Sequence, residues 1–174
     1  MAHLPLRLSQ EEREVTTEYR RKSVKSQLNF RNVEASPEDP IETWPIEGIE
    51  IALDRGSLHY WRKLALAVQG DPWGPVARRV EHVLSYGRPY GIAPAMEQVI
   101  ADARNASQIA ERAAVRKEIG MLVDKSGLVG TEFAERIGTS PSRLSTYLSG
   151  KVVPSAAVME RMRNITDLVA KASS

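Results

Sequence analysis

The chain has 174 residues, no cysteine, a formal net charge of +2 and a pI near 9.0. The absence of cysteine excludes a disulfide scaffold and a thiolate metal site, and it fits a reducing cytoplasm. No apolar stretch approaches membrane-spanning length, and residues 1–5 lack the apolar block of a signal peptide, so we expect a cytoplasmic protein without a membrane partner.

The N-terminal part begins with a predicted charged helix over residues 10–30, which Ser9 and Glu12 would open as a capping box. The basic residues of this helix are Arg20, Arg21, Lys22 and Lys25. In the favoured interpretation they form a solvated face; in the alternative they form an arm that grasps DNA. Residues 36–40 contain two prolines and two acids, so they predict a linker.

Three short helices with tight joints follow, with predicted bounds of 43–56, 57–70 and 71–87. Their apolar residues recur at helical spacing. The predicted inward residues are Ile46, Ile49 and Leu53, then Trp61, Leu64, Ala65 and Val68, then Val76, Val80, Val83 and Leu84. This region contains all three tryptophans of the chain, Trp44, Trp61 and Trp73. We expect them to nucleate the core of this region, in preference to forming an aromatic surface for a partner.

A turn is predicted over residues 86–91, and the helical pattern resumes after Pro94 with Met96 and Ile100 on its inner face. The alanine-rich sequence from there to Lys125 allows one long helix or two helices. A break or bend at residues 105–107 is the favoured alternative. We find no strand-period stretch and no internal repeat, so the chain is predicted to be all-α.

Two short helical patterns follow each other closely between Leu128 and Ser155, which is the part of the chain most informative about function. Their inward residues are predicted to be Phe133, Ala134 and Ile137 in the first, and Leu144, Tyr147 and Leu148 in the second. Gly138 suits a turn with positive φ. Ser140 can cap the second helix, and Pro141 suits its first position because the missing N–H costs nothing there.

This arrangement resembles the helix-turn-helix of the lambda-repressor and Cro family, also called the Xre family. The matching positions are Gly127, Leu128, Ala134, Gly138, Leu144, Ser149, Gly150, Lys151, Pro154 and Ser155, extended by Val115, Ile119, Leu122, Val123, Val158, Met162 and Ile165. The resemblance implies a DNA-binding domain over residues 112–174, with its first helix near 113–125 and a last helix capped by Ser155. Residues 1–111 form a helical region of no recognised family, for dimerisation or partner binding.

Two positions depart from the family pattern. Gly130 stands where many members carry a glutamine that grips the DNA backbone. Val123 and Leu148 stand where members often bury an Arg–Glu pair, and a buried apolar pair can replace an ion pair with little loss of stability.

The resemblance implies that the helix 140–149 enters the major groove of double-stranded DNA. The candidate DNA-binding residues comprise base contacts and phosphate contacts. The former are Pro141, Ser142, Arg143 and Thr146; the latter are Ser140, Ser145, Lys151 and backbone amides at the start of the first motif helix. For Arg143 the alternative is a surface ion pair with Glu132. Val152 and Val153 replace basic residues of many relatives.

No residues suggest catalysis, a cofactor or a metal site. The histidines, His3, His59 and His82, are scattered without ligand spacing, and residues 70–75 are stiffened by proline, so they indicate a helix start and no nucleotide cradle. We therefore expect a nucleoid-associated, homodimeric transcriptional regulator, with repression the favoured outcome. The alternative is an antitoxin whose N-terminal region neutralises a toxin protein. In a third hypothesis that region only dimerises.

Overall fold

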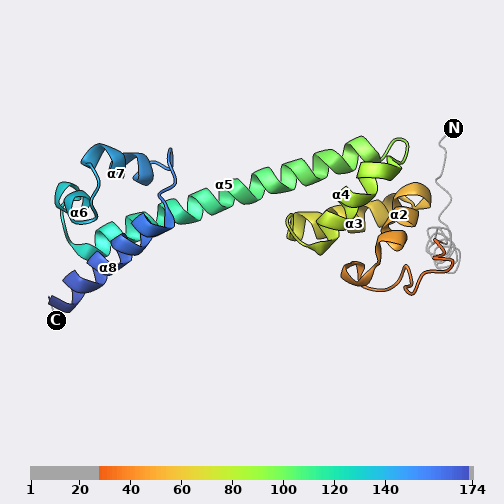
Figure 1. Cartoon of the computed structure of the whole chain (residues 1–174), viewed down its shortest axis with the longest axis horizontal. Helices are drawn as coiled ribbons and strands as arrows, with labels where there is room; N and C mark the ends of the chain where they lie inside the picture. The colour runs from red at the N-terminus through yellow and green to blue at the C-terminus, as the bar shows by residue number, and fades with distance from the viewer. Residues whose placement is uncertain (1–27, 173–174) are drawn as a thin grey trace, which may run out of the picture. The chain divides into compact units, whose positions relative to one another are not determined.

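The computed structural model describes residues 28–172, and all regular structure within that range is helical, as predicted (Figure 1). The chain divides into two compact units, residues 1–103 and 104–174. This division and the predicted boundary between residues 111 and 112 both fall within helix α5, Ala93–Ser126. The helix predicted over residues 10–30 lies outside the described residues, except for residues 28–30, which are not helical.

The first unit packs three short helices against one another after a short 3-10 helix, η1. The bounds are Ile41–Thr43 for η1, Ile46–Arg55 for α2, Leu58–Gly70 for α3 and Pro75–Gly87 for α4. The three helices are predicted to end at glycines, at Gly56, Gly70 and Gly87. The observed helix ends lie at these glycines or one residue before them. The joints are therefore tight, and α2 packs against both α3 and α4.

Trp44 lies at the centre of this core and is fully buried, as predicted. The Phe30 ring meets the Trp44 ring edge-on, with centroids 5.0 Å apart. Nε1 of Trp44 donates a hydrogen bond to the Asp39 carbonyl at 3.1 Å. Trp61 packs half-buried against the same core and donates from Nε1 to the Ala52 carbonyl at 2.9 Å. Tyr60, which the periodicity did not single out, is buried beside Trp44.

The prediction that Trp73 belongs to the core is wrong, because this side chain is 48% exposed. It lies in a turn, closed by a hydrogen bond from Gly74 N to the Asp71 carbonyl at 3.1 Å, and Pro72 is buried there instead. Consequently α4 begins at Pro75 rather than at residues 71–72, with the missing N–H of proline at its first turn.

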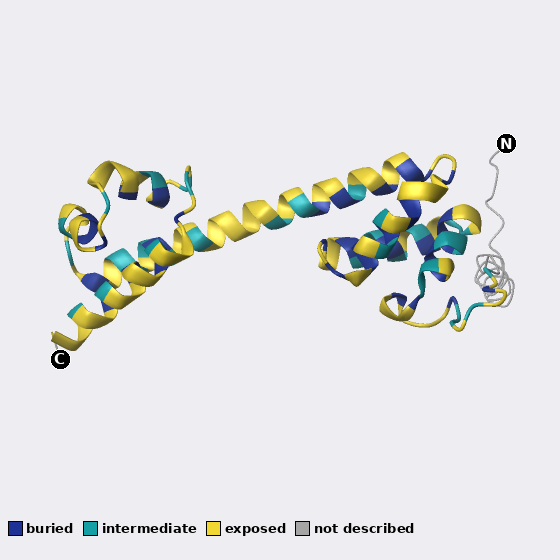
Figure 2. Ribbon diagram, viewed as in Figure 1, coloured by how far each residue is buried: buried dark blue, intermediate teal, exposed yellow. Residues whose placement is uncertain are grey.

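Of the favoured alternatives at residues 105–107, the break is also wrong, because α5 continues through them as one helix of 34 residues. Asn105 and Ser107 are weak helix formers, but alanines surround them and no proline interrupts. Ser107 Oγ also donates to Glu111 Oε1, one turn later, at 2.9 Å. The first turns of α5 supply Met96 and Ile100 to the first core, whereas residues 108–114 are all exposed (Figure 2).

The second unit combines the end of α5 with α6, Gly130–Arg136, α7, Pro141–Leu148, and α8, Ala156–Ala172. Its core holds Ile119, Phe133, Ile137 and Met162, all fully buried. At the helix start Ser155 Oγ accepts from Val158 N at 3.4 Å, which confirms the predicted cap.

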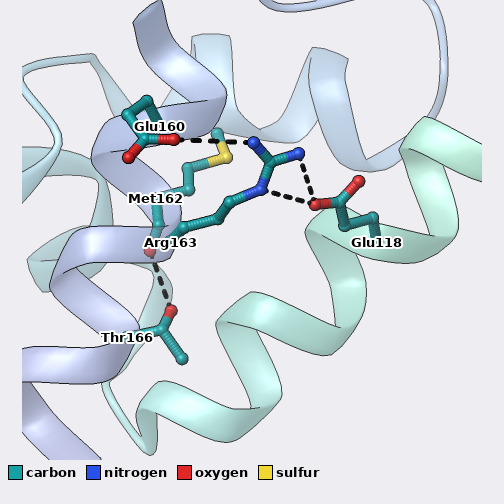
Figure 3. Close-up of polar contacts among 5 residues, drawn as sticks. All are labelled: Glu118, Glu160, Met162, Arg163 and Thr166. Carbon is teal, nitrogen blue, oxygen red and sulfur yellow. Dashed lines mark hydrogen bonds and ion pairs between the residues drawn. The ribbon is translucent and has the colours of Figure 1, made fainter. Parts of the chain in front are cut away.

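Polar contacts also join α8 to α5 (Figure 3). The guanidinium of Arg163 lies between Glu118 of α5, at 2.8 Å, and Glu160 of its own helix, at 3.6 Å. Thr166 Oγ1 donates to the carbonyl of Met162, at 2.9 Å. It also bonds to the carbonyl of Leu122 of α5, at 3.1 Å. Since Thr166 is buried, these bonds satisfy a hydroxyl that would otherwise be costly to remove from water.

Candidate nucleic-acid interface

The turn between α6 and α7 has the geometry that the sequence predicts. Gly138 has a φ of +72°, a conformation that strains any residue with a Cβ, so glycine is favoured there by conformation. A Cβ would lie 2.9 Å from Nη1 of Arg161, which is the flexible end of a long side chain and can move aside. Ala134 is fully buried, and its carbonyl accepts from Thr139 N at 2.9 Å. The chain thus leaves α6 and enters α7 within a few residues.

Ser140 caps α7, as predicted: its Oγ accepts from Arg143 N at 3.1 Å, and Pro141 occupies the first helical position. α7 buries one face through Leu144 and Tyr147. The rest of the helix surface is exposed and carries the candidate residues Pro141, Ser142, Arg143 and Ser145. Arg143 lies beside the buried face, four residues before Tyr147. Thr146 is half-buried, and Lys151 is exposed just after the helix.

Arg143 contacts Tyr147 rather than the predicted alternative partner, Glu132. Its Nε donates to the Tyr147 hydroxyl at 3.2 Å, and its guanidinium lies 5.7 Å from the centroid of the Tyr147 ring. Glu132 instead pairs with Arg136 at 2.8 Å, one turn along α6. The guanidinium of Arg143 is therefore held on the exposed face of α7 by a residue of the same helix.

Two hydroxyls near the end of α7 bond to the backbone. Thr146 Oγ1 donates to the Arg143 carbonyl at 2.7 Å, and Ser149 Oγ donates to the Thr146 carbonyl at 3.1 Å. A hydroxyl that donates its proton keeps lone pairs. Thr146 can thus still accept a hydrogen bond from a base while it holds the backbone of Arg143.

The predicted buried pair of Val123 and Leu148 is wrong. Leu148 is 38% exposed, whereas Val123 packs against the buried cluster of the second unit. Leu148 is the last residue of α7, and the chain turns away at Gly150 with a φ of +75°. The helix therefore ends before its last side chain is covered.

Two arginines beside α7 were not identified from the sequence, because they come from other helices. Arg161 of α8 lies at the Gly138 turn, and a Cβ at Gly150 would lie 3.3 Å from Cδ of Arg116 of α5. Basic side chains thus lie at both turns that flank α7. Their sequence neighbours carry no cue for this placement, because it depends on how α5 and α8 pack.

The two units also differ in charge. Residues 1–103 hold fifteen acidic and thirteen basic side chains, whereas residues 104–174 hold seven acidic and eleven basic ones. A local excess of positive charge attracts the phosphates of DNA. The unit that contains α7 therefore has the sign that a DNA-binding surface requires.

Within residues 28–172 no group of three or more His, Asp or Glu side chains is placed to hold a metal ion. None of the helices that the structure describes is both long and apolar enough to cross a membrane.

Residues 105–169 match the sequence model of a helix-turn-helix domain family. Neither a search of curated proteins nor one of solved structures finds a match to the chain. The match covers α6, α7 and most of α8 together with the second half of α5. The C-terminal part of the chain is thus a helix-turn-helix domain, consistent with the Xre resemblance, and a domain of this class indicates a DNA-binding regulator.

Proposed function

We propose that the protein is a transcriptional regulator, most simply a repressor, that binds a specific operator with α7 in the major groove. The observation that supports this most is the division of α7 into two faces. Leu144 and Tyr147 anchor one face in the core, whereas Pro141, Ser142 and Arg143 are exposed at the N-terminal end of the helix. A helix-turn-helix presents this end of its second helix to base edges.

Each exposed residue has a role in this proposal. Arg143 reads guanine through two hydrogen bonds, and Ser142 and Thr146 contact neighbouring base edges. Ser140, Ser145 and Lys151 contact phosphates. Arg116 and Arg161 add positive charge beside the same helix.

The length of α7 favours binding as a homodimer. Its eight residues span about 12 Å, so one copy reaches only a few base pairs. Two copies on a two-fold-symmetric site read a longer sequence. Repression follows where that site overlaps a promoter.

A selection of bound sequences from a random pool of duplex DNA tests the proposal. We expect a defined, two-fold-symmetric site for the wild-type chain. Arg143→Ala should lose one base preference in each half-site, at a cost of about 1–3 kcal/mol, because its contact is specific. Lys151→Ala should weaken binding to all sequences and reduce the salt slope by about one unit, because its contact is to phosphate.

Enrichment of no sequence by the wild type would contradict operator binding. Equal losses for both variants on every sequence would contradict the assignment of Arg143 to bases and Lys151 to phosphate.

A second candidate function is that of an antitoxin, favoured by the acidic first unit. A groove of about 650 Å³ between η1, α3 and the start of α4 has an apolar wall that includes Leu66, 66% exposed. Its charged lining residues are four acids and one base: Glu38, Asp39, Glu42, Asp71 and Lys63. Such a groove suits a basic protein with an apolar anchor. Co-expression with the product of a neighbouring gene tests this: a stoichiometric complex that Leu66→Asp abolishes supports it, and two separate proteins contradict it.

A further inference from the structure

We propose that Tyr147 is a positioning residue, whose hydroxyl orients the guanidinium of Arg143 for reading a base. The inference rests on the proposed function, because it assigns a task to the exposed arginine of α7. It goes beyond that function by placing part of the sequence specificity in a side chain of the hydrophobic core.

The geometry holds Arg143 at three places. Its backbone N–H donates to Ser140 Oγ at 3.1 Å, and its carbonyl accepts from Thr146 Oγ1 at 2.7 Å. Its side chain is held by Tyr147, through the 3.2 Å bond from Nε to the hydroxyl and the ring contact at 5.7 Å. Backbone and side chain are therefore both restrained in the absence of DNA.

Tyr147 is a suitable support because it is itself packed into the core. Its side chain is only 5% exposed and lies in the buried cluster with Phe133 and Leu144. Its hydroxyl reaches the edge of that cluster, where Arg143 is exposed. The hydroxyl thus gives a flexible surface side chain a fixed point of contact with the core.

The donors that remain free fit the recognition of guanine. An arginine has five N–H donors, and only the one on Nε is used by Tyr147. The terminal nitrogens can still donate to O6 and N7 of a guanine. Because the bond restricts the side chain beforehand, less rotamer freedom is lost when DNA binds.

The substitution Tyr147→Phe isolates this role. Phenylalanine keeps the ring, its packing and the contact with the guanidinium, and removes only the hydroxyl. The matched control is Tyr86→Phe, which also removes a tyrosine hydroxyl bonded to a charged side chain, here Glu50 at 3.3 Å, but in the first unit.

The experiment measures affinity for the selected site and for the same site with the Arg143-dependent base changed. For Tyr147→Phe we expect the ratio of the two affinities to fall by about two- to tenfold, as befits one lost hydrogen bond. Affinity for unrelated DNA and the thermal midpoint should stay unchanged. The double variant Arg143→Ala/Tyr147→Phe should match Arg143→Ala alone, because Tyr147 acts through Arg143.

Three results would overturn the proposal. One is an unchanged ratio in Tyr147→Phe, provided that Arg143→Ala loses its base preference. Another is an equal loss of affinity on all sequences with a lowered thermal midpoint, which would make the hydroxyl merely structural. The third is a double variant worse than Arg143→Ala. If the wild type selects no site at all, the proposed function itself fails, which is a distinct outcome.

Discussion

Both units contain short helices, but they build different cores with them. The first unit gathers Phe30, Trp44 and Tyr60 into an aromatic centre and carries excess negative charge. The second buries Phe133 and Tyr147 among aliphatic residues and methionines and carries excess positive charge. Only the second matches a known family. Its turn imposes steric demands at fixed positions, whereas the joints of the first unit need only ordinary glycine stops, which many folds share.

The largest expected effects come from truncating the centre of each core. Trp44→Ala should destabilise the first unit by about 3–5 kcal/mol, and Phe133→Ala the second by a similar amount, because each leaves a large cavity. Since all tryptophans lie in the first unit, fluorescence excited selectively from tryptophan follows that unit during denaturation, without a signal from Tyr147. DNA affinity follows the second.

The comparison predicts that each variant changes one readout only. Trp44→Ala should shift the fluorescence transition, still reported by Trp61 and Trp73, and leave DNA affinity intact. Phe133→Ala should lower DNA affinity and leave the fluorescence transition unchanged. If either variant moved both readouts together, the two cores would be coupled and their contrast would break down.

A smaller effect is expected at the turn that distinguishes the second unit. Gly138→Ala should cost about 1–2 kcal/mol, because alanine is strained at positive φ and its Cβ would meet Arg161. Gly120→Ala is the control, because Gly120 lies within helix α5 with open space around a Cβ; it should stabilise by up to about 1 kcal/mol. Thermal unfolding followed by circular dichroism separates the two, and a neutral Gly138→Ala would refute the steric account of the turn.

The smallest effect is expected at the surface contact between α5 and α8. Glu118 raises the pKa of Arg163 by a hydrogen bond and by its charge, but both side chains are accessible to solvent. Glu118→Gln should therefore lower the thermal midpoint only slightly, and the difference should vanish in high salt. A large, salt-independent loss would show that polar contacts, rather than apolar packing, hold α8 in place.

Local chemistry explains which predictions succeed. Gly138, Ser140 and Pro141 act through their own backbone and immediate neighbours, so their roles were visible in the sequence and are confirmed. The errors concern residues whose fate depends on distant parts of the chain. Trp73 has the spacing of a core residue but lies in the turn before α4. Leu148 has an inward phase, but α7 ends before it is covered.

The sequence by itself therefore determined the helical class, most helix ends and the turn between α6 and α7, because periodicity and capping act within a few residues. Tertiary structure decided which side chains surround α7. Residues four apart along a helix can pair, and that spacing allowed both Glu132 with Arg136 and Arg143 with Tyr147. Only the packing of Tyr147 into the core made its hydroxyl a fixed acceptor, and only the packing of α5 and α8 brought Arg116 and Arg161 to the ends of the same helix.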